Sequence, residues 1–516
     1  MFDLAVAGLE HVFVPANLLF LFIGVFAGIV FGALPGLTAT MGLALLVPFT
    51  FTMAPTAGLI MLAGIYVGAM YGDAVPAILI NTPGTPAAIA TSFDGFPLSQ
   101  KGMAQHGLVA AAVASSFGSL VANIVLLTAA PPLAAASLKF GPPEYFWLGV
   151  FGLTIIATLS TGSVLKGFLA GALGLLLSTI GMAPIGGDVR LTFGHPEMQA
   201  GIELIVALIG FFCLPEILGS VIGKRQAKYS SENAKPELSV VWEVMSSLFK
   251  KPVLMFRSAF IGTVVGFAPG AGGNIASMVS YNEACRWDKN PEEFGKGTIK
   301  GVAASEAANS AMAPGSLVPL LTLGIPGSPP AAVILGALML HGMRPGGELF
   351  TVHGQVVYAF MMALLVAAFF VTIIGCFGSF VFSRIINIPS RFLAPVIIFM
   401  TVLGSYAIRN NMLDVWIMLI FGVVGFISNK LKFHPAPIVL GLILGPFVEE
   451  GLVQSMLAGH ATGSVVHYMV FRPISIVLIT LSLLSALWPI YASWKHKRKQ
   501  RREGCACNIE EGVKNA

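Results

Sequence analysis

Long stretches with very few charged residues limit most strongly what this chain can fold into. Examples are residues 12–33, 145–161, 200–219, 359–382 and 474–492. Each is close to the roughly 20 residues that an α-helix needs to cross a bilayer. Over the whole chain only 10% of residues are charged, against about a quarter in soluble proteins. The sequence therefore predicts an all-α polytopic membrane protein with roughly 10–12 transmembrane helices.

Basic residues gather in two segments. Residues 223–257 contain seven Lys or Arg, and residues 495–502 read KHKRKQRR. The positive-inside rule places both segments in the cytoplasm. Basic runs also bind nucleic acid, but a run that directly follows a hydrophobic helix is better explained by membrane orientation. We expect a lipid bilayer and no nucleic acid as partner, and a retained first helix because a basic leader region is missing.

The five cysteines predict no disulfide framework. They are Cys213, Cys285, Cys376, Cys505 and Cys507. The last two lie in the tail expected to be cytoplasmic, where disulfides rarely persist. They lack partners at zinc-site spacing, so we expect inert thiols, with metal binding or acylation as the alternatives.

Two parts of the chain repeat one plan. Residues 24–41 resemble residues 258–275 at an offset of 234, and residues 72–86 resemble residues 315–329 at an offset of 243. The first match comprises Gly28, Gly32, Pro35 and Gly36 with Gly262, Gly266, Pro269 and Gly270. The second comprises Gly72, Val75, Pro76, Pro83, Gly84 and Pro86 with Gly315, Val318, Pro319, Pro326, Gly327 and Pro329. The loop 285–297 accounts for the difference in offset.

The repeat divides the chain into four parts. We predict a first transmembrane repeat at 1–222, a cytoplasmic linker at 223–254, a second repeat at 255–494 and a basic cytoplasmic tail at 495–516. The segment before the first copy has no Lys or Arg, whereas the basic linker precedes the second. This difference favours an inverted-topology repeat, and a parallel repeat is the alternative.

Each copy carries a Pro-Gly phrase inside an apolar stretch. Residues 80–88 read INTPGTPAA and residues 323–332 read LGIPGSPPAA. Pro-Gly breaks a helix, and the flanks are too short to span a bilayer separately. We predict a re-entrant hairpin at each phrase, with a second half-helix that starts just after Thr85-Pro86 or Ser328-Pro329. Thr85 or Ser328 would be its N-cap, and the proline would be its first residue.

The start of such a half-helix exposes backbone N–H groups that can bind a carboxylate. The predicted substrate-binding residues are Asn81, Thr82, Gly84, Thr85, Gly324, Gly327 and Ser328. The alternative is that both phrases are buried turns without a ligand.

Other polar residues could hold an ion or substrate. The Gly-rich phrases GALPGLTATM and GFAPGAGGNIASM contain Thr38, Thr40, Asn274 and Ser277, which offer oxygens to a cation such as Na⁺. Close helix packing through small residues explains these phrases equally well. Asp73 and Glu306 are carboxylates at membrane depth, and Asn309 shares a helix face with Glu306. Either carboxylate could carry a proton or bind a cation. No other metal or cofactor is expected.

Signatures of common enzymes are missing from the sequence. It contains no GxxxxGK[ST] phosphate loop, no HExxH and no GxSxG motif. We therefore expect that the chain is not an enzyme.

Two long motifs are similar to those of a known family. YGDAVPAILINTPGTPAAIATSFDGFPLSQKG at 71–102 and FGKGTIKGVAASEAANSAMAPGSLVPLLTLGIPGSP at 294–329 resemble the large membrane subunit of tripartite tricarboxylate transporters. The resemblance covers nearly the whole chain except the tail. The family pattern often reads Gly-Gly-Ser where this chain has Gly72-Asp73-Ala74, and often has Ala-Pro at Ala304-Ser305. The added carboxylate disfavours a trianion near it, so a different coupling ion or a less charged acid is implied.

The resemblance implies a secondary transporter in the bacterial inner membrane. Its partners would be a small membrane subunit, a periplasmic solute-binding protein and an organic anion such as citrate. We expect import by symport with Na⁺ or H⁺, because each anionic charge costs about 2.3 kcal/mol at 100 mV. An organic-anion channel or a gradient-driven exporter of the same fold is the alternative.

Overall fold

The computed structural model describes residues 2–34, 37–159, 164–222, 237–268, 272–378, 382, 390–431, 433 and 435–487. The described residues are almost entirely helical, and the only strands among them form one short antiparallel pair. Six of the helices in these ranges are long and apolar enough to cross a membrane. They are Pro15–Ala33, Pro55–Ile80, Ala104–Ser137, Gly354–Phe377, Met412–Lys430 and Ala436–Ala461. The predicted all-α polytopic class is confirmed.

The chain separates into two compact units. Unit 1 comprises Met1–Lys139 and Gly194–Leu431, and unit 2 comprises Phe140–Phe193 and Lys432–Ala516. Each predicted repeat contributes to both units. The two units therefore do not correspond to the two predicted repeats. The linker predicted at 223–254 as the boundary between the repeats remains a prediction from the sequence.

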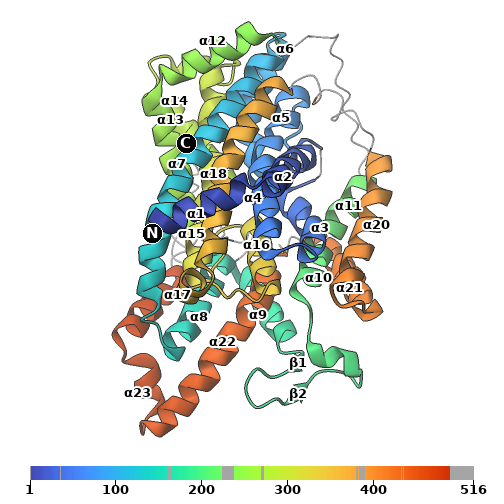
Figure 1. Cartoon of the computed structure of the whole chain (residues 1–516), viewed down its shortest axis with the longest axis vertical. Coiled ribbons are helices and arrows are strands. Elements are labelled where there is room, and N and C mark those ends of the chain that lie inside the picture. The colour runs from blue at the N-terminus through green and yellow to red at the C-terminus, as the bar shows by residue number, and fades with distance from the viewer. Residues whose placement is uncertain are drawn as a thin grey trace, which may run out of the picture. The chain divides into compact units, whose positions relative to one another are not determined.

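Unit 1 holds most of the helices (Figure 1). Its first part contains α1 (Phe2–Phe13), α2 (Pro15–Ala33), α3 (Ala39–Phe51), α4 (Pro55–Gly72), α5 (Ala74–Ile80), η1 (Pro86–Ala88), α6 (Ile89–Gln100) and α7 (Ala104–Ser137). Its second part begins with η2 (Pro196–Ala200), α10 (Leu204–Leu208), η3 (Ile209–Cys213), α11 (Leu214–Ile222) and α12 (Leu238–Phe249). There follow α13 (Pro252–Phe267), α14 (Gly272–Trp287), η4 (Pro291–Glu293), α15 (Ile299–Leu323), α16 (Pro329–Leu340), α17 (Gly347–Val352), α18 (Gly354–Phe377), α20 (Ser390–Arg409) and α21 (Met412–Lys430).

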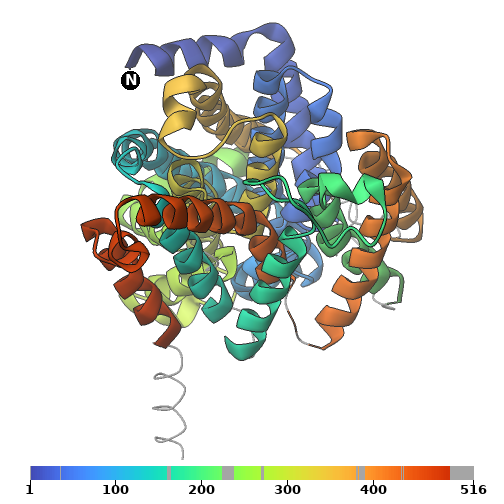
Figure 2. The same cartoon turned by 90° about the horizontal axis from the view of Figure 1, so that it is seen from below.

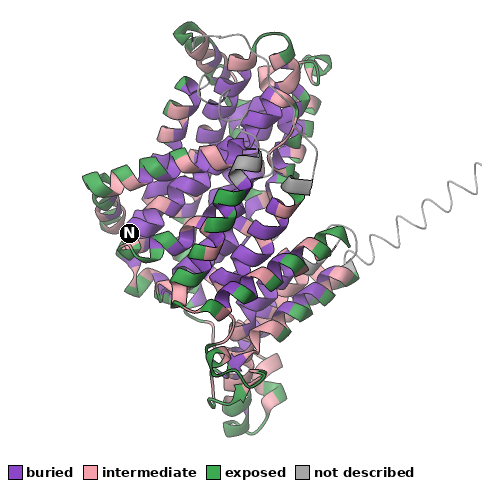
Figure 3. Ribbon diagram, turned by 90° about the vertical axis from the view of Figure 1, so that its right-hand side faces the viewer, coloured by how far each residue is buried: buried purple, intermediate pink, exposed green. Residues whose placement is uncertain are grey.

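The core of unit 1 is built from α4, α7, α15 and α18. Helix α7 packs against both α15 and α18, and α4 packs against α2 and α18. Helix α1 lies crosswise to α18 and contacts it, as Figures 1 and 2 show. Figure 3 shows that buried residues concentrate on the inner helices and exposed ones on the outer helices. Outward-facing apolar side chains are expected for helices that contact lipid.

Small residues let the inner helices approach closely. Gly32 of α2 lies against α4, where an added Cβ would come within 2.6 Å of the Ala69 carbonyl oxygen. Gly266 of α13 lies in the same way against α15, 2.6 Å from the Met312 carbonyl oxygen. These are the close backbone contacts that small residues allow between membrane helices. The matched glycines of the two copies thus have the same packing role.

Unit 2 contains α8 (Pro142–Leu159), α9 (Val164–Ser178), α22 (Ala436–Ala461), α23 (Val465–Val470) and a final helix, Pro473–Leu487. Strands β1 (Gly181–Met182) and β2 (Val189–Arg190) pair antiparallel, with Gly181 opposite Arg190. Arg190 of this hairpin forms an ion pair with Glu449 of α22 at 2.7 Å. The buried Glu144 of α8 is paired with Arg472 at 2.7 Å. Both units are therefore held by packing plus a few specific polar contacts.

Parts of several sequence predictions lie outside the described residues. These are Pro35-Gly36, Pro269-Gly270, residues 223–236 of the linker and the tail with Cys505 and Cys507. Cys213, Cys285 and Cys376 are free thiols.

Candidate functional site

The first Pro-Gly turn (residues 81–85) joins α5 to η1 and α6. Helix α5 ends at Ile80, and its C-cap Asn81 has a left-handed backbone with φ 51°. The Thr82 N–H then donates to the Pro76 carbonyl at 3.2 Å, and the Gly84 N–H donates to the Asp73 carbonyl at 3.4 Å. Thr85 is extended, and the helical path resumes at Pro86, as predicted. Helices α5 and α6 contact each other.

The second Pro-Gly turn (residues 324–328) has the same backbone arrangement. Helix α15 ends at Leu323, and its C-cap Gly324 is left-handed with φ 74°. The Ile325 N–H donates to Pro319 and the Gly327 N–H donates to Ser316, both at 3.3 Å. Ser328 is extended, and α16 starts at Pro329. Each of these hydrogen bonds corresponds to one in the first turn at the offset of 243.

The glycines of the two turns are needed for close packing. A Cβ on Gly84 would lie 2.8 Å from the Gly32 carbonyl oxygen, and one on Gly327 would lie 2.5 Å from the Gly266 carbonyl oxygen. Real Cβ atoms do not approach other atoms so closely, so each turn is pressed against the helix that carries the matched Gly phrase. The N–H groups of both glycines already donate to backbone carbonyls of the chain. The role of these glycines is therefore to hold the turns in place by close packing.

Asp73 is the polar centre of the first turn. It is 1% exposed, and the Thr85 hydroxyl donates to its Oδ2 at 2.5 Å. The Asn309 side-chain amide donates to its Oδ1 at 3.4 Å and to the Met70 carbonyl at 3.2 Å. Thr85 was predicted as a helix cap, but its hydroxyl accepts from no backbone N–H and instead donates to the Asp73 carboxylate.

Three hydroxyl groups occupy the corresponding position at the second turn. Ser316 and Ser328 Oγ lie 3.2 Å apart. The Tyr66 hydroxyl lies 3.1 Å from Ser316 Oγ and 3.0 Å from Ser328 Oγ. All three side chains are buried. Ser328 also accepts a hydrogen bond from the Ala331 N–H, so its predicted role as the N-cap of α16 is confirmed.

The two turns are braced crosswise. Tyr66 belongs to α4, before the first turn, yet it binds the side chains of the second turn. Asn309 belongs to α15, before the second turn, yet it binds Asp73 at the first turn. Tyr66 and Asn309 correspond to each other at the offset of 243, as do Asp73 and Ser316. A reciprocal exchange of this kind is what a twofold relation between the two copies would produce.

Glu306 is a second buried carboxylate. It is fully buried, and its two oxygens accept hydrogen bonds from the hydroxyls of Thr91 on α6 and Ser115 on α7. Within the described ranges neither Glu306 nor Asp73 forms an ion pair. A buried carboxylate without a cationic partner is costly, and in membrane proteins such groups commonly serve ion or proton movement.

The remaining predicted residues have mixed positions. Thr38 caps α3 by accepting from the Met41 N–H at 3.2 Å, and Thr40 is buried in the first turn of the same helix. Ser277 of α14 donates to the Ala87 carbonyl at 2.7 Å, just after the first turn. Asn81 and Asn274 are exposed, and Thr82 is half-buried. Among the described residues, no group of three His, Cys, Asp or Glu side chains is arranged to hold a metal ion.

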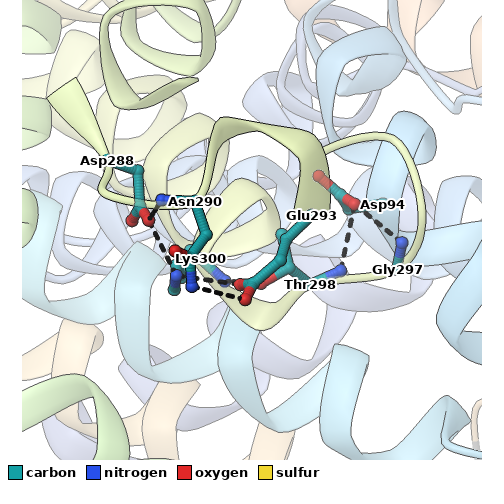
Figure 4. A network of polar contacts seen from close by, with 7 residues as sticks. All are labelled: Asp94, Asp288, Asn290, Glu293, Gly297, Thr298 and Lys300. Atoms are coloured by element: carbon teal, nitrogen blue, oxygen red, sulfur yellow. Dashed lines mark hydrogen bonds and ion pairs between the residues drawn. The ribbon is translucent and has the colours of Figure 1, made fainter. Parts of the chain in front are cut away.

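A polar network joins α6 to the loop before α15 (Figure 4). The buried Asp94 accepts from the N–H groups of Gly297 and Thr298 at 2.8 and 3.0 Å and from the Tyr281 hydroxyl at 2.9 Å. Lys300 pairs with Asp288 and Glu293, each at 2.9 Å. The loop at residues 285–297, which is present only in the second copy, is therefore attached to α6, the helix that follows the first turn.

The ion pairs of this loop lower the pKa values of its carboxylates. The hydrogen bond from the Lys300 ammonium holds the pKa of Glu293 below its ordinary value. Burial raises the pKa of Asp288, but the Asn290 N–H and the Lys300 ammonium outweigh it, and the pKa is lowered.

Sequence reasoning missed Tyr66, Ser316, Thr91, Ser115 and Asp94. The offset of 243 was a usable signal for two of them, because it relates Tyr66 to Asn309 and Ser316 to Asp73. The other three are recognisable only when α6 and α7 are placed beside α15.

Comparison with known proteins decides the family. Residues 18–440 match the Tripartite tricarboxylate transporter TctA family. The chain belongs to this family. It is 36% identical over 491 residues to an "uncharacterized 52.8 kDa protein in TAR-I ttuC' 3'region" of Agrobacterium vitis, covering 95% of this chain and 96% of that protein. It is also 35% identical over 239 residues to an "uncharacterized protein in TAR-II ttuC' 3'region" of the same organism, covering 46% of this chain and 98% of that protein.

Membership in the TctA family defines the chain as a component of a tricarboxylate transporter. A tripartite system implies partner subunits. Together with the long apolar helices, the family indicates a multi-pass membrane protein.

Proposed function

We propose that this TctA-family chain is the translocating subunit of a secondary transporter that imports a di- or tricarboxylate-type organic anion. A Na⁺ or H⁺ gradient would drive the import. A periplasmic solute-binding protein would deliver the substrate, and a small membrane subunit would complete the complex. The chain would lie in the bacterial inner membrane with its C-terminus in the cytoplasm.

The crosswise bracing of the two Pro-Gly turns carries this proposal. Tyr66 contacts Ser316 and Ser328, and Asn309 contacts Asp73. In many transporters, breaks in two repeated halves meet at the substrate and ion sites near the bilayer midplane. The reciprocal contacts support a twofold relation between the copies, and we propose that both turns are re-entrant and face one shared site.

The chemistry of the turns suits an organic anion and a coupling ion. Thr85 and Ser328 stand at the start of helical segments. The Ser328 hydroxyl can donate to a carboxylate, whereas the Thr85 hydroxyl already donates to Asp73. Asp73 and Glu306 add two buried carboxyl groups. Import of a trianion against 100 mV would cost about 7 kcal/mol, so coupling to a cation gradient is required for accumulation.

Uptake of labelled di- and tricarboxylates by cells that express the three subunits tests the proposal. We expect saturable uptake that needs the binding protein and collapses when the Na⁺ and H⁺ gradients are removed. Ser328→Ala should lower uptake without loss of the protein from the membrane. Ser137→Ala, which removes a buried hydroxyl that binds only the local Ala134 carbonyl among the contacts described, is the matched control.

Three results would contradict the proposal. Unsaturable, gradient-independent flux would indicate a channel, and gradient-driven efflux would indicate an exporter. A chemically altered acid would indicate an enzyme.

A further inference from the structure

The two Pro-Gly turns share a backbone but present opposite chemistry. At corresponding positions the first turn has Asp73, Thr85 and Asn309, whereas the second has Ser316, Ser328 and Tyr66. The first set contains a carboxylate and an amide oxygen. The second set contains three hydroxyl groups and no charge. Two sites that share a backbone arrangement but differ in their side chains are suited to different ligands.

Asn309 defines the chemistry of the first site. Its amide nitrogen donates to the Met70 carbonyl and to Asp73 Oδ1. Because both partners are acceptors, the atom that contacts them must be the amide nitrogen, and the other polar atom of the side chain is therefore the oxygen. That oxygen is buried and has no hydrogen-bond partner among the described residues. An unsatisfied buried acceptor costs roughly 1–3 kcal/mol.

The unpaired oxygen points toward the start of α14. A Cβ on Gly273 would overlap Asn309 Oδ1, and the same position lies 3.0 Å from Ala87 Cβ. The oxygen therefore lies between α14 and the segment that follows the first turn. Ser277 of α14 binds the Ala87 carbonyl in the same region.

We propose that the first Pro-Gly turn binds the coupling cation, and that this cation is Na⁺ held by oxygens of Asp73, Thr85 and Asn309. The substrate carboxylate is then held at the second turn by the hydroxyls of Ser328 and Tyr66, whose positions Ser316 fixes while its own hydroxyl donates to the Ala313 carbonyl at 2.8 Å. The Asp73 carboxylate balances the single positive charge of Na⁺, and the neutral oxygens of Thr85 and Asn309 complete its coordination. An anion at the first turn would face Asp73 and an unpaired acceptor, both of which repel it, whereas the Ser328 and Tyr66 hydroxyls of the second turn can donate to it.

This inference rests on the proposed function, but a direct binding measurement tests it separately. Thermal unfolding of the purified membrane complex is measured in increasing NaCl at constant ionic strength, with choline chloride as the replacement salt. We expect a saturable stabilisation by Na⁺ that equal KCl does not produce. Asp73→Asn should raise the half-saturating Na⁺ concentration by about tenfold or more.

Ser316→Ala is the matched control, because Ser316 corresponds to Asp73 in the other turn. It should leave the Na⁺ stabilisation unchanged while raising the KM for the acid in uptake assays. Asn309→Ala provides a second test of the cation site if Asp73→Asn expresses poorly, and it should also weaken the effect of Na⁺.

The outcomes separate the two proposals. A wild-type complex without Na⁺-specific stabilisation, or with stabilisation that Asp73→Asn leaves unchanged, overturns the cation site even when gradient-driven uptake persists. Uptake driven by a proton gradient without Na⁺ also overturns it, and would assign a proton to Asp73. Na⁺ stabilisation that depends on Asp73 without uptake of any acid would support the cation site and count against the proposed function.

Discussion

Tyr66 and Asn309 stand at corresponding positions in the two copies. Tyr66 bonds to Ser328 of the second Pro-Gly turn, and Asn309 bonds to Asp73, which holds Thr85 of the first turn. The two turns are consequently braced by each other's preceding helix. Neither turn can move as a free loop without breaking a buried hydrogen bond. This relation connects the duplication in the sequence with the geometry of the candidate site.

Tyr66→Phe tests the brace at the second turn. The change removes one buried hydroxyl and leaves Ser316 and Ser328 bonded to each other. We expect a loss of about 1–2 kcal/mol in unfolding free energy and a higher KM for substrate. Tyr358→Phe, in a buried tyrosine of α18 away from the turns, is the control. Equal effects of the two changes in thermal unfolding and uptake would argue against a specific brace.

Gly84→Ala and Gly327→Ala test the packing of the turns. The added methyl groups would collide with the carbonyl oxygens of Gly32 and Gly266. We expect each change to cost about 1–3 kcal/mol, visible as lower expression and a lower unfolding temperature. Gly219 of α11 has open space around it, so Gly219→Ala should be neutral or slightly stabilising. Normal stability of both turn variants would show that the helices can separate easily.

Asp94→Asn tests the attachment of α6 to the loop before α15. The carboxylate accepts two backbone N–H groups close to the start of α15, where negative charge is favourable. The amide keeps the shape but loses the charge and one acceptor. We expect about 1–2 kcal/mol less protection of residues 295–300 in hydrogen exchange. Unchanged exchange there would mean that packing alone holds the loop.

Acid should loosen the loop at residues 288–300. The pKa values of Glu293 and Asp288 are lower in the folded protein than their ordinary values. Their contribution to stability is therefore fully present above the ordinary carboxylate pKa and is lost as the pH falls through the lowered folded values. The protection of this loop against hydrogen exchange, corrected for the intrinsic exchange rate at each pH, should fall below about pH 4.

Lys300→Met is the variant that tests this cause. It removes the partner of both carboxylates, so the loop should exchange faster at neutral pH and depend less on acid. A pH dependence equal to that of the wild type would show that other groups cause it.

Local rules determined much of this protein from the sequence alone. Long stretches poor in charge predicted the membrane helices, and Pro-Gly predicted where they break. Helical segments start at Pro86 and Pro329 because a proline at the first position of a helix loses no hydrogen bond. These features depend on neighbouring residues, which the sequence displays directly.

Only the tertiary structure decided which polar groups meet. Thr91 and Ser115 reach Glu306 from helices far away in the chain, and Thr85 binds Asp73 instead of capping a helix. The direction of the Asn309 amide follows from the acceptors that surround its nitrogen. Such contacts arise from close helix packing, and a buried polar group takes the partner that packing brings nearest.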